Sequence, residues 1–333
     1  MTDRRGFSFG LLAMLTAACG SRASGHATAP SDPWWSTWRA RFLRPDGRVV
    51  DTGNNGISHS EGQGYGMLFA VHADDRDAFT RMAAWTETHL ARSDVALFSW
   101  RYDPSATAPV SDPNNASDGD ILIAWALALA GAKWNETKYL ARSTQIRAAL
   151  LGRCVIERHG LKVIVPGMAG FAEGTQVVLN PSYYIWPALN RFAKIDGAQA
   201  WGRVIADGLT LLEQARFGSN RLPTDWVALC APGKLVPAPG RDPRFGYDAV
   251  RVPLYAMMGE LPSLAAPVAK FWRECLATDK PIPAWIDVET GQIANYPISS
   301  GGAAIAARLL GLTEPEWLAD DYYAASLQML ARI

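Results

Sequence analysis

Apolar residues recur along most of the chain at the spacing of an α-helix. Between residues 76 and 92, for example, Phe79, Met82 and Ala83 lie three or four positions apart and share one helical face. Patterns of this kind predict eleven helices, at residues 34–42, 62–72, 76–92, 119–132, 138–157, 182–193, 198–216, 247–259, 264–277, 302–310 and 314–331.

The predicted helices are of two kinds, and the difference indicates an architecture. Residues 121–130 are apolar on every side, so protein has to cover this helix almost completely, whereas other helices are apolar on one face only. Alternation of inner, apolar helices with outer, amphipathic helices predicts an all-α fold of six helical hairpins, an (α/α)6 barrel.

A few segments fall outside the helical pattern. Two strand-like runs, 161–165 and 176–179, predict a small β-hairpin on one face of the barrel. Three long loops, 43–60, 93–117 and 218–246, hold much of the polar, Pro and Gly content. In a ring of hairpins such loops collect at one end, so we expect them to form a cleft there.

The first residues have the pattern of an export signal. Arg4 and Arg5 form a charged start, and residues 7–18 form an apolar stretch that is too short to cross a bilayer. We therefore expect a signal peptide and linker at residues 1–29 and a single folded domain at residues 30–333. No later segment is apolar enough to predict a transmembrane helix.

The four cysteines predict neither a disulfide framework nor a zinc site. Cys19 follows a run similar to a lipoprotein cleavage box, so its lipidation is the alternative to ordinary signal cleavage. Cys154, Cys230 and Cys275 are odd in number and have no Cys-x-x-Cys or Cys/His spacing. We expect buried free thiols, with one disulfide as the alternative.

Composition narrows the class of ligand. Lys plus Arg and Asp plus Glu number 32 each, so the chain gives no reason to expect a nucleic acid or an anionic membrane surface as partner. A neutral polymer or a small neutral ligand fits better. The chain also has 13 Trp and 10 Tyr, which stack well on sugar rings, although core packing explains most of them.

Glu61 stands at the start of a predicted helix and is followed by Gly62, Gly64 and Gly66. Each Gly costs roughly 0.5–1 kcal/mol relative to Ala inside a helix, so three of them require either close helix packing or close approach of a ligand. The helix dipole favours an ionised carboxylate at this position. A general acid requires desolvation instead, so spacing alone leaves a surface acid and a catalytic acid open.

Asp118 and Asp120 lie where the apolar helix begins. Either Ser117 or Asp118 is a good N-cap residue. Two carboxylates exceed what a cap needs, so we expect one of them to face the cleft and bind sugar hydroxyls.

Two further runs enter helices. Asp248 and Arg251 are three positions apart, which fits a surface ion pair or, in a buried site, an arginine that keeps a general base ionised. The run 180–186 places Tyr183 at a helix start, where its ring packs in the core or stacks on a ligand. Other chemistries lack their motifs: there is no Gly-x-Ser-x-Gly, no Walker sequence and no His cluster, so we expect neither cofactor nor metal.

Four of these runs together resemble glycoside hydrolase family 8. They are residues 60–67, 116–125, 180–183 and 247–251, and they agree with the family in order and spacing. The resemblance extends from about residue 34 to residue 333. Within the family it is nearest to the periplasmic endoglucanases of bacterial cellulose synthesis operons.

The resemblance implies an (α/α)6 catalytic domain that hydrolyses β-1,4-linked glycans with inversion. By motif, Glu61 corresponds to the general acid, Asp248 to the general base, and Asp118 to the catalytic-site acid that binds the sugar at the cleavage point. We expect further contacts with substrate from Tyr183, Arg251, Asp120, Trp125, Tyr247 and Trp226.

Two alternatives stay open. Other members of the family cleave xylan, chitosan or mixed-linkage glucan, so the substrate is a separate question from the reaction. A noncatalytic glucan-binding or assembly factor could use the same cleft, but it would not need an acid and a base together. The resemblance further implies an exported enzyme with a β-1,4-glucan as its partner and the cellulose synthase machinery as a second one.

Overall fold

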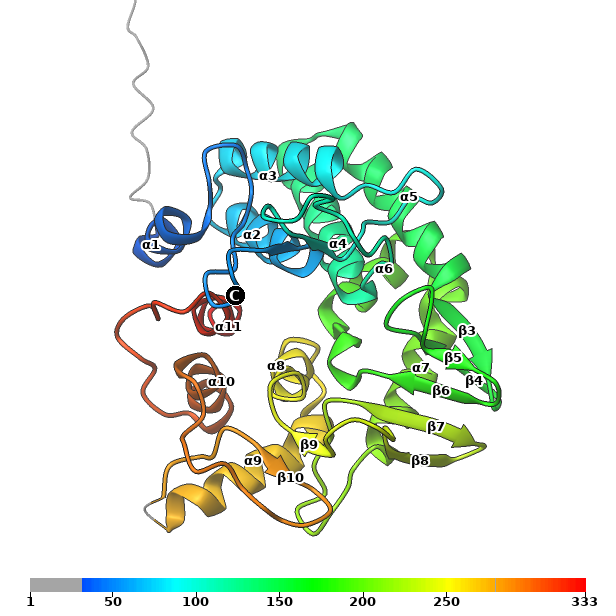
Figure 1. Ribbon diagram of the computed structural model, residues 1–333, viewed down its shortest axis with the longest axis vertical. Coiled ribbons are helices and arrows are strands. Elements are labelled where there is room, and N and C mark those ends of the chain that lie inside the picture. Colours follow the sequence, from blue (N-terminus) through cyan, green and yellow to red (C-terminus); the bar gives the residue numbers. More distant parts are fainter. Residues whose placement is uncertain (1–31, 279) are drawn as a thin grey trace, which may run out of the picture. The chain divides into compact units, whose positions relative to one another are not determined.

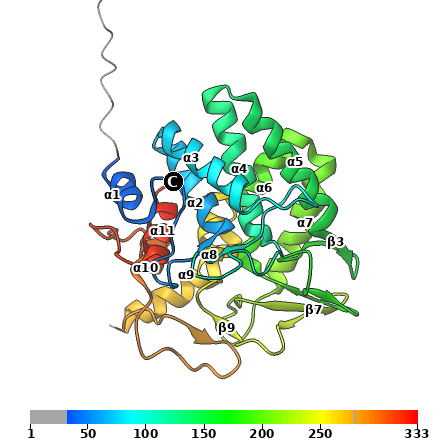
Figure 2. The same ribbon diagram turned by 45° about the horizontal axis from the view of Figure 1, so that its top comes forward.

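Six helices follow one another around a ring in the computed structural model, which describes residues 32–278 and 280–333 (Figures 1 and 2). Each helix packs against the next, and the last packs against the first. The six are α2 (Ser60–His72), α4 (Ser117–Trp134), α6 (Trp186–Asp196), α8 (Arg251–Met258), α10 (Ser300–Leu310) and α11 (Tyr322–Ala331).

Five more helices pack on the outside of this ring. They are α1 (Pro33–Phe42), α3 (Arg76–His89), α5 (Thr137–Arg153), α7 (Ala198–Gln214) and α9 (Pro262–Ala277). Helices α3, α5, α7 and α9 each pack against the inner helix that precedes or follows them in the chain, and α1 packs against α2 and α11. The predicted (α/α)6 fold is confirmed, with eleven α-helices in the part of the chain that the structure describes.

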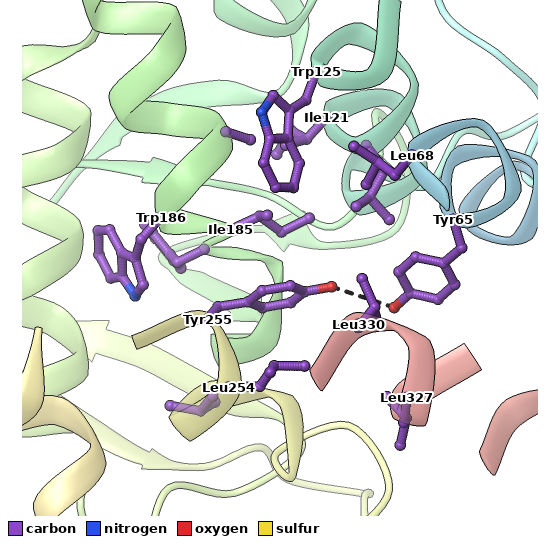
Figure 3. Close-up of a cluster of buried hydrophobic side chains, with 14 of the residues drawn as sticks. Tyr65, Leu68, Ile121, Trp125, Ile185, Trp186, Leu254, Tyr255, Leu327 and Leu330 are labelled. Atoms are coloured by element: carbon purple, nitrogen blue, oxygen red, sulfur yellow. Dashed lines mark hydrogen bonds between the residues drawn. The ribbon is translucent and has the colours of Figure 1, made fainter. Parts of the chain in front are cut away.

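Burial separates the two groups of helices as the sequence pattern predicts. Helix α4 is buried without interruption from Ser117 to Ala128, whereas α3 buries a single face that includes Phe79, Met82 and Trp85. Side chains from the inner helices meet in an apolar core that includes Tyr65, Leu68, Ile121, Trp125, Ile185, Trp186, Leu254, Tyr255, Leu327 and Leu330 (Figure 3). This core holds the starts of α2, α4 and α8 at fixed positions.

Some helix boundaries differ from the prediction. The helix predicted at 314–331 begins only at Tyr322, where the Asp321 side chain accepts a hydrogen bond from the Ala324 amide as an N-cap. Helix α4 begins at Ser117, so the N-cap position belongs to Ala116, and neither Ser117 nor Asp118 caps the helix. The prediction of a cap at those two residues is wrong.

The strands lie between the helices in four small antiparallel sheets. In two sheets β3 (Val155–Arg158) pairs with β4 (Leu161–Ile164), and β1 (Ser58–His59) pairs with β2 (Arg101–Tyr102). The strands β5 (Ala172–Glu173), β6 (Gln176–Leu179), β7 (Val227–Ala231) and β8 (Lys234–Pro237) form a four-stranded sheet, and β9 (Arg244–Phe245) pairs with β10 (Ile286–Asp287).

The predicted pairing of 161–165 with 176–179 is wrong, although both runs are strands. The first run pairs with β3, a segment that the sequence analysis assigned to the end of a helix. Helix α5 ends at Arg153, and His159 and Gly160 both have positive φ, as a tight hairpin turn requires. The second run pairs with β5 and with β7, whose position about fifty residues further along is invisible to local pattern.

The described residues contain no disulfide, because Cys154, Cys230 and Cys275 are all free thiols, with Cys154 buried. Among the described helices, none has both the length and the apolar character needed to span a membrane. The predicted signal peptide and linker at residues 1–29, with Cys19, lie outside the residues that the structure describes.

Candidate active site

A cavity of about 250 Å³ lies where α2, α4 and α8 begin. Its lining brings together residues from all four of the runs that resemble family 8. The lining residues are Asn54, His59, Ser60, Glu61, Trp100, Ala116, Asp118, Tyr183, Tyr247, Asp248, Arg251 and Tyr323. Two of the three long loops, 43–60 and 93–117, contribute to it as predicted, whereas the third, 218–246, supplies no lining residue.

Close packing of α2 on α4 places Glu61 beside Asp118. A Cβ added to Gly64 would lie 2.6 Å from the Cβ of Leu122, and one added to Gly119 would lie 2.7 Å from the backbone nitrogen of Glu61. Both distances are too short for real contacts, so the two helices can approach this closely only with glycine at these positions. Of the two explanations for the glycines, helix packing is therefore the one that the structure supports.

Glu61 is held on the cavity side of this crossing. The Tyr65 hydroxyl, one turn further along α2, donates a hydrogen bond to its Oε1 over 3.0 Å, and Arg251 forms an ion pair with the same oxygen. Only 17% of the Glu61 side chain is exposed. The surface position that spacing alone left open is thus excluded. The neighbouring Arg251 cation favours the ionised carboxylate, however, which is the opposite of what a proton donor needs.

Arg251 lies between three carboxylates. Besides its contact with Glu61, its Nη2 lies 2.6 Å from Oδ1 of Asp248, and its Nη1 lies 3.6 Å from Oδ2 of Asp118. The Arg251 side chain is 3% exposed, so the surface ion pair that its spacing also allowed is excluded. Because protein carboxylates occupy its guanidinium, Arg251 organises the acids of the cavity rather than offering all its donors to a sugar.

Burial works against ionisation of the cavity acids. It raises the pKa of Asp248 to about 8, with the nearby Asp225 and Asp118 carboxylates adding to the rise. It also raises the pKa of Asp118 to about 7, against hydrogen bonds from the Gly119 amide and the Tyr183 hydroxyl. Desolvation therefore works against the ionised form of Asp248, whereas the ion pair with Arg251 favours it.

Tyr183 and Tyr247 reach the cavity from two other elements. Tyr183 ends a short 3-10 helix, Pro181–Tyr183, in which the Asn180 side chain accepts a hydrogen bond from the Ser182 amide. Tyr247 is about half exposed, and its hydroxyl lies 2.6 Å from that of Tyr296. The predicted positions of both rings at the site are supported by the lining of the cavity.

Asp120 and Trp125 do not fit the expected contact with substrate. Asp120 is fully buried and accepts hydrogen bonds from the Phe98 amide (2.9 Å) and from Asn115 Nδ2 (2.8 Å), away from the cavity lining. Trp125 points into the apolar core (Figure 3). Both belong to the recognised motif on α4, but an α-helix turns successive side chains to different sides, so of its two acids only Asp118 reaches the cavity.

Trp226 also lies outside the cavity lining, but it contacts a residue that belongs to it. Its ring packs edge-on against Tyr183 and stacks on Phe171 with a centroid distance of 6.0 Å. The Arg241 guanidinium lies 3.9 Å from the ring centroid. Trp226 therefore contacts Tyr183 without lining the cavity itself.

Sequence reasoning missed several residues of the site, of which Asp225 has the most contacts. Its Oδ1 accepts hydrogen bonds from the amides of Gly246, Asp248 and Ala249, at 3.2, 3.0 and 2.7 Å. Burial raises its pKa to about 6. Asp225 stands alone between Thr224 and Trp226, without a motif, and no local pattern connects it to a turn more than twenty residues away.

The other missed residues come from loops and from α11. His59 precedes Glu61 and lies 3.0 Å from Asp51 through its Nε2. Trp100 donates its indole N–H to Asp112, and the Tyr323 hydroxyl donates to the Tyr247 carbonyl over 2.7 Å. Across residues 32–278 and 280–333, no three His, Cys, Asp or Glu side chains gather in a way that could hold a metal ion.

Comparison with known proteins places the chain among glycoside hydrolases. The family described as glycosyl hydrolases family 8 matches residues 7–333. An endoglucanase of Cellulomonas uda is 42% identical over 84% of this chain and 77% of its own length. A probable endoglucanase of Novacetimonas hansenii is 39% identical over 97% of this chain and 98% of its own length.

Solved structures agree with this assignment. A family 8 endo-β-1,4-glucanase from an Achatina fulica gut metagenomic library has a TM-score of 0.87 and 41% identity, covering 91% of this chain and 97% of its own. An endo-β-1,4-glucanase from Acetobacter xylinum has a TM-score of 0.85 and 41% identity, covering 90% and 95%. With its motifs gathered in one cavity and a family match over almost its whole length, the chain belongs to glycosyl hydrolases family 8.

Proposed function

We propose that this chain is an exported endo-β-1,4-glucanase, which hydrolyses cellulose-type glucan with inversion at the anomeric carbon. The observation that carries the proposal is that Glu61 and Asp248 flank a single buried guanidinium in a cavity of a family 8 chain. Two carboxylates on either side of a reacting sugar are the recurring equipment of glycoside hydrolysis. The relatives named above as endoglucanases support the choice of β-1,4-glucan.

Glu61 is the general acid in this proposal and Asp248 the general base. Glu61 donates its proton to the glycosidic oxygen as the bond to the anomeric carbon breaks. Asp248 takes a proton from the water that attacks that carbon on the opposite face. Inversion requires the carboxyl groups to lie roughly 6.5–9.5 Å apart, with room for the water. Asp118, on the adjacent helix start, binds the sugar at the point of cleavage.

The protons have to be redistributed before cleavage. Burial favours the protonated form of Asp248, whereas the Arg251 contact favours the ionised form of Glu61. A glucan oxygen that inserts between Glu61 and Arg251 reverses this order. It takes the cation away from Glu61, which then binds a proton from solvent. Arg251 keeps its contact with Asp248, which releases a proton to solvent, so the number of protons on the two carboxyl groups is unchanged.

The proposal has two kinds of alternative, another substrate and a function without catalysis. Xylan and chitosan are the alternatives to cellulose-type glucan within the family, and a noncatalytic glucan-binding factor is the alternative outside it. Release of reducing ends from carboxymethylcellulose, xylan and chitosan, measured side by side, separates the substrates. The proposal expects carboxymethylcellulose to be cleaved fastest, and preference for either other polymer would contradict the substrate assignment.

The Glu61→Gln variant separates enzyme from binding factor. It should lower kcat on carboxymethylcellulose by about 10²–10⁴-fold, because the amide cannot donate the proton, while binding of cellopentaose measured by calorimetry persists. Glu213→Gln on the outer helix α7 is the matched control and should keep wild-type activity. Equal activity of Glu61→Gln and the wild type would rule out Glu61 as the acid.

Export and a role in cellulose synthesis complete the proposal. The N-terminal pattern of two arginines and an apolar stretch supports secretion into the periplasm or beyond. Trimming of glucan chains beside the cellulose synthase machinery is the role that we propose there. Deletion of the gene should change the yield or the fibre order of the polymer, and an unchanged polymer would contradict this role.

A further inference from the structure

The candidate acid and base do not have the same kind of support from the backbone. Glu61 belongs to helix α2, whereas Asp248 precedes helix α8, which begins only at Arg251. A carboxylate in a turn can be displaced by small changes in backbone dihedrals. A base that must reach one water molecule therefore needs something else to hold its turn.

Asp225 supplies that support. One oxygen of its side chain accepts hydrogen bonds from three groups of the turn, the amides of Gly246, Asp248 and Ala249. Its own amide donates to the Arg244 carbonyl over 2.7 Å, which ties its backbone to strand β9 just before the turn. Asp225 does not line the cavity, so a direct contact with the sugar does not explain its presence.

Hydrogen bonding alone does not explain why this residue is an aspartate. An asparagine carbonyl oxygen could accept from the same amides. A second negative charge beside the Asp248 carboxylate in this partly buried place is costly, because like charges repel more strongly where the dielectric constant is low. The charge is therefore the feature of Asp225 that needs an explanation beyond the turn.

We propose that Asp225 is a positioning residue for the general base. It holds the 246–249 turn through three amides, and it places a second negative charge next to Asp248 that makes this base a better proton acceptor. The inference rests on the proposed function, in which Asp248 is the base. A stronger base draws the proton from water more completely, and Arg251 keeps the base ionised once it is free to do so.

Other groups also face Asp248 and have to be constant in any test of its titration. They are Asp118 from α4, Arg251 from α8, Arg241 from the loop before the turn, and the hydroxyls of Tyr183 and Tyr323. Asn180 hydrogen-bonds to Asp248 and lowers its pKa, and the charge of Arg244 lowers the pKa of Asp225. None of these side chains changes when Asp225 alone is substituted.

Two variants separate the hydrogen bonds from the charge. Asp225→Asn keeps an acceptor for the amides and removes the charge, whereas Asp225→Ala removes both. Asp75→Asn, at the N-cap of the outer helix α3, is a matched control remote from the cavity. The measurements are the pH profile of kcat/KM and the kcat on a soluble cello-oligosaccharide, with thermal unfolding to verify folding.

In Asp225→Asn the acid limb of kcat/KM should move to lower pH by on the order of one unit, because loss of a neighbouring negative charge lowers the pKa of Asp248. In Asp225→Ala the same shift should be joined by a kcat about tenfold or more below that of Asp225→Asn, since the turn is released. The control should keep the wild-type acid limb.

An acid limb in Asp225→Asn that coincides with the wild type would overturn the inference, and so would equal kcat values for the two Asp225 variants. If Asp225→Ala does not fold, the acid limb of Asp225→Asn decides alone. A wild type that cleaves no polymer of the panel contradicts the proposed function instead, so the two failures are distinguishable.

Discussion

Glu61 and Asp248 contact different nitrogens of the same Arg251 guanidinium, yet the chain holds them in different ways. Glu61 stands on helix α2, which packs closely on α4. At Gly64 and Gly119 the contact leaves no room for a side chain. Asp248 stands in a turn whose amides donate to a single partly buried carboxylate, that of Asp225.

The two kinds of support predict different effects of substitution, on stability near Glu61 and on kinetics near Asp248. The position of Glu61 is part of the packing of α2 on α4, so disturbing it should cost stability of the whole domain. The position of Asp248 depends on a few hydrogen bonds and charges outside the core, so disturbing it should change kinetics and pH dependence first. Arg251 contacts both Glu61 and Asp248, so its substitution should have the largest effect.

Arg251→Met removes the cation from both sides at once. The buried Asp118 and the partly buried Glu61 and Asp248 would lose their partner, so the free energy of unfolding at about pH 8 should fall by roughly 3–5 kcal/mol. At about pH 5 the loss should be smaller, because Asp118 and Asp248, with pKa values raised to about 7 and about 8, are then protonated and need no cation. Urea unfolding at the two pH values measures this, and an equal loss at both would contradict it.

Asp120→Ala tests the start of α4 on the Glu61 side. It leaves the Phe98 amide and the Asn115 side chain without their acceptor in a buried place, so we expect a loss of about 2–4 kcal/mol in unfolding free energy. The KM for a soluble cello-oligosaccharide should stay that of the wild type, whereas Asp118→Asn should raise it. A raised KM in Asp120→Ala would restore Asp120 to the substrate-binding residues.

Gly64→Ala tests the close packing of α2 on α4. The new methyl group would collide with Leu122, so the variant should lose about 1–3 kcal/mol in unfolding free energy through overpacking. It should also lose activity, since α2 carries Glu61.

Gly152→Ala is the matched control for Gly64→Ala, and it should change the free energy of unfolding least. It also lies inside a helix, α5, but a Cβ there meets no atom within 4 Å. It should gain about 0.5–1 kcal/mol from helix propensity. Equal effects of the two substitutions would mean that backbone propensity, and not packing, explains Gly64.

The sequence predicts those residues of the site that lie in short, recognisable runs. Glu61, Asp118, Tyr183 and Asp248 each lie in a short run with recognisable neighbours, and the structure brings all four to one cavity. The ring of inner and outer helices follows from the contrast between fully apolar and amphipathic segments.

What depends on contacts distant in sequence could not be predicted. Asp225 is far in sequence from the turn that it holds, and β6 finds its partner β7 only after two helices intervene. Asp120 belongs to a recognised motif, but its direction depends on where Phe98 and Asn115 lie. Burial of the acids, and so their raised pKa values, also emerges only when the helix starts converge.

The anomeric form of the first product tests the central claim most directly, which is that Glu61 and Asp248 act from opposite faces of the sugar. Proton NMR of cellopentaose hydrolysis, recorded before mutarotation, distinguishes the two forms at the new reducing end. We expect the α-anomer to appear first, because water attacks the face opposite the β-linkage. A product that appears first as the β-anomer would contradict it.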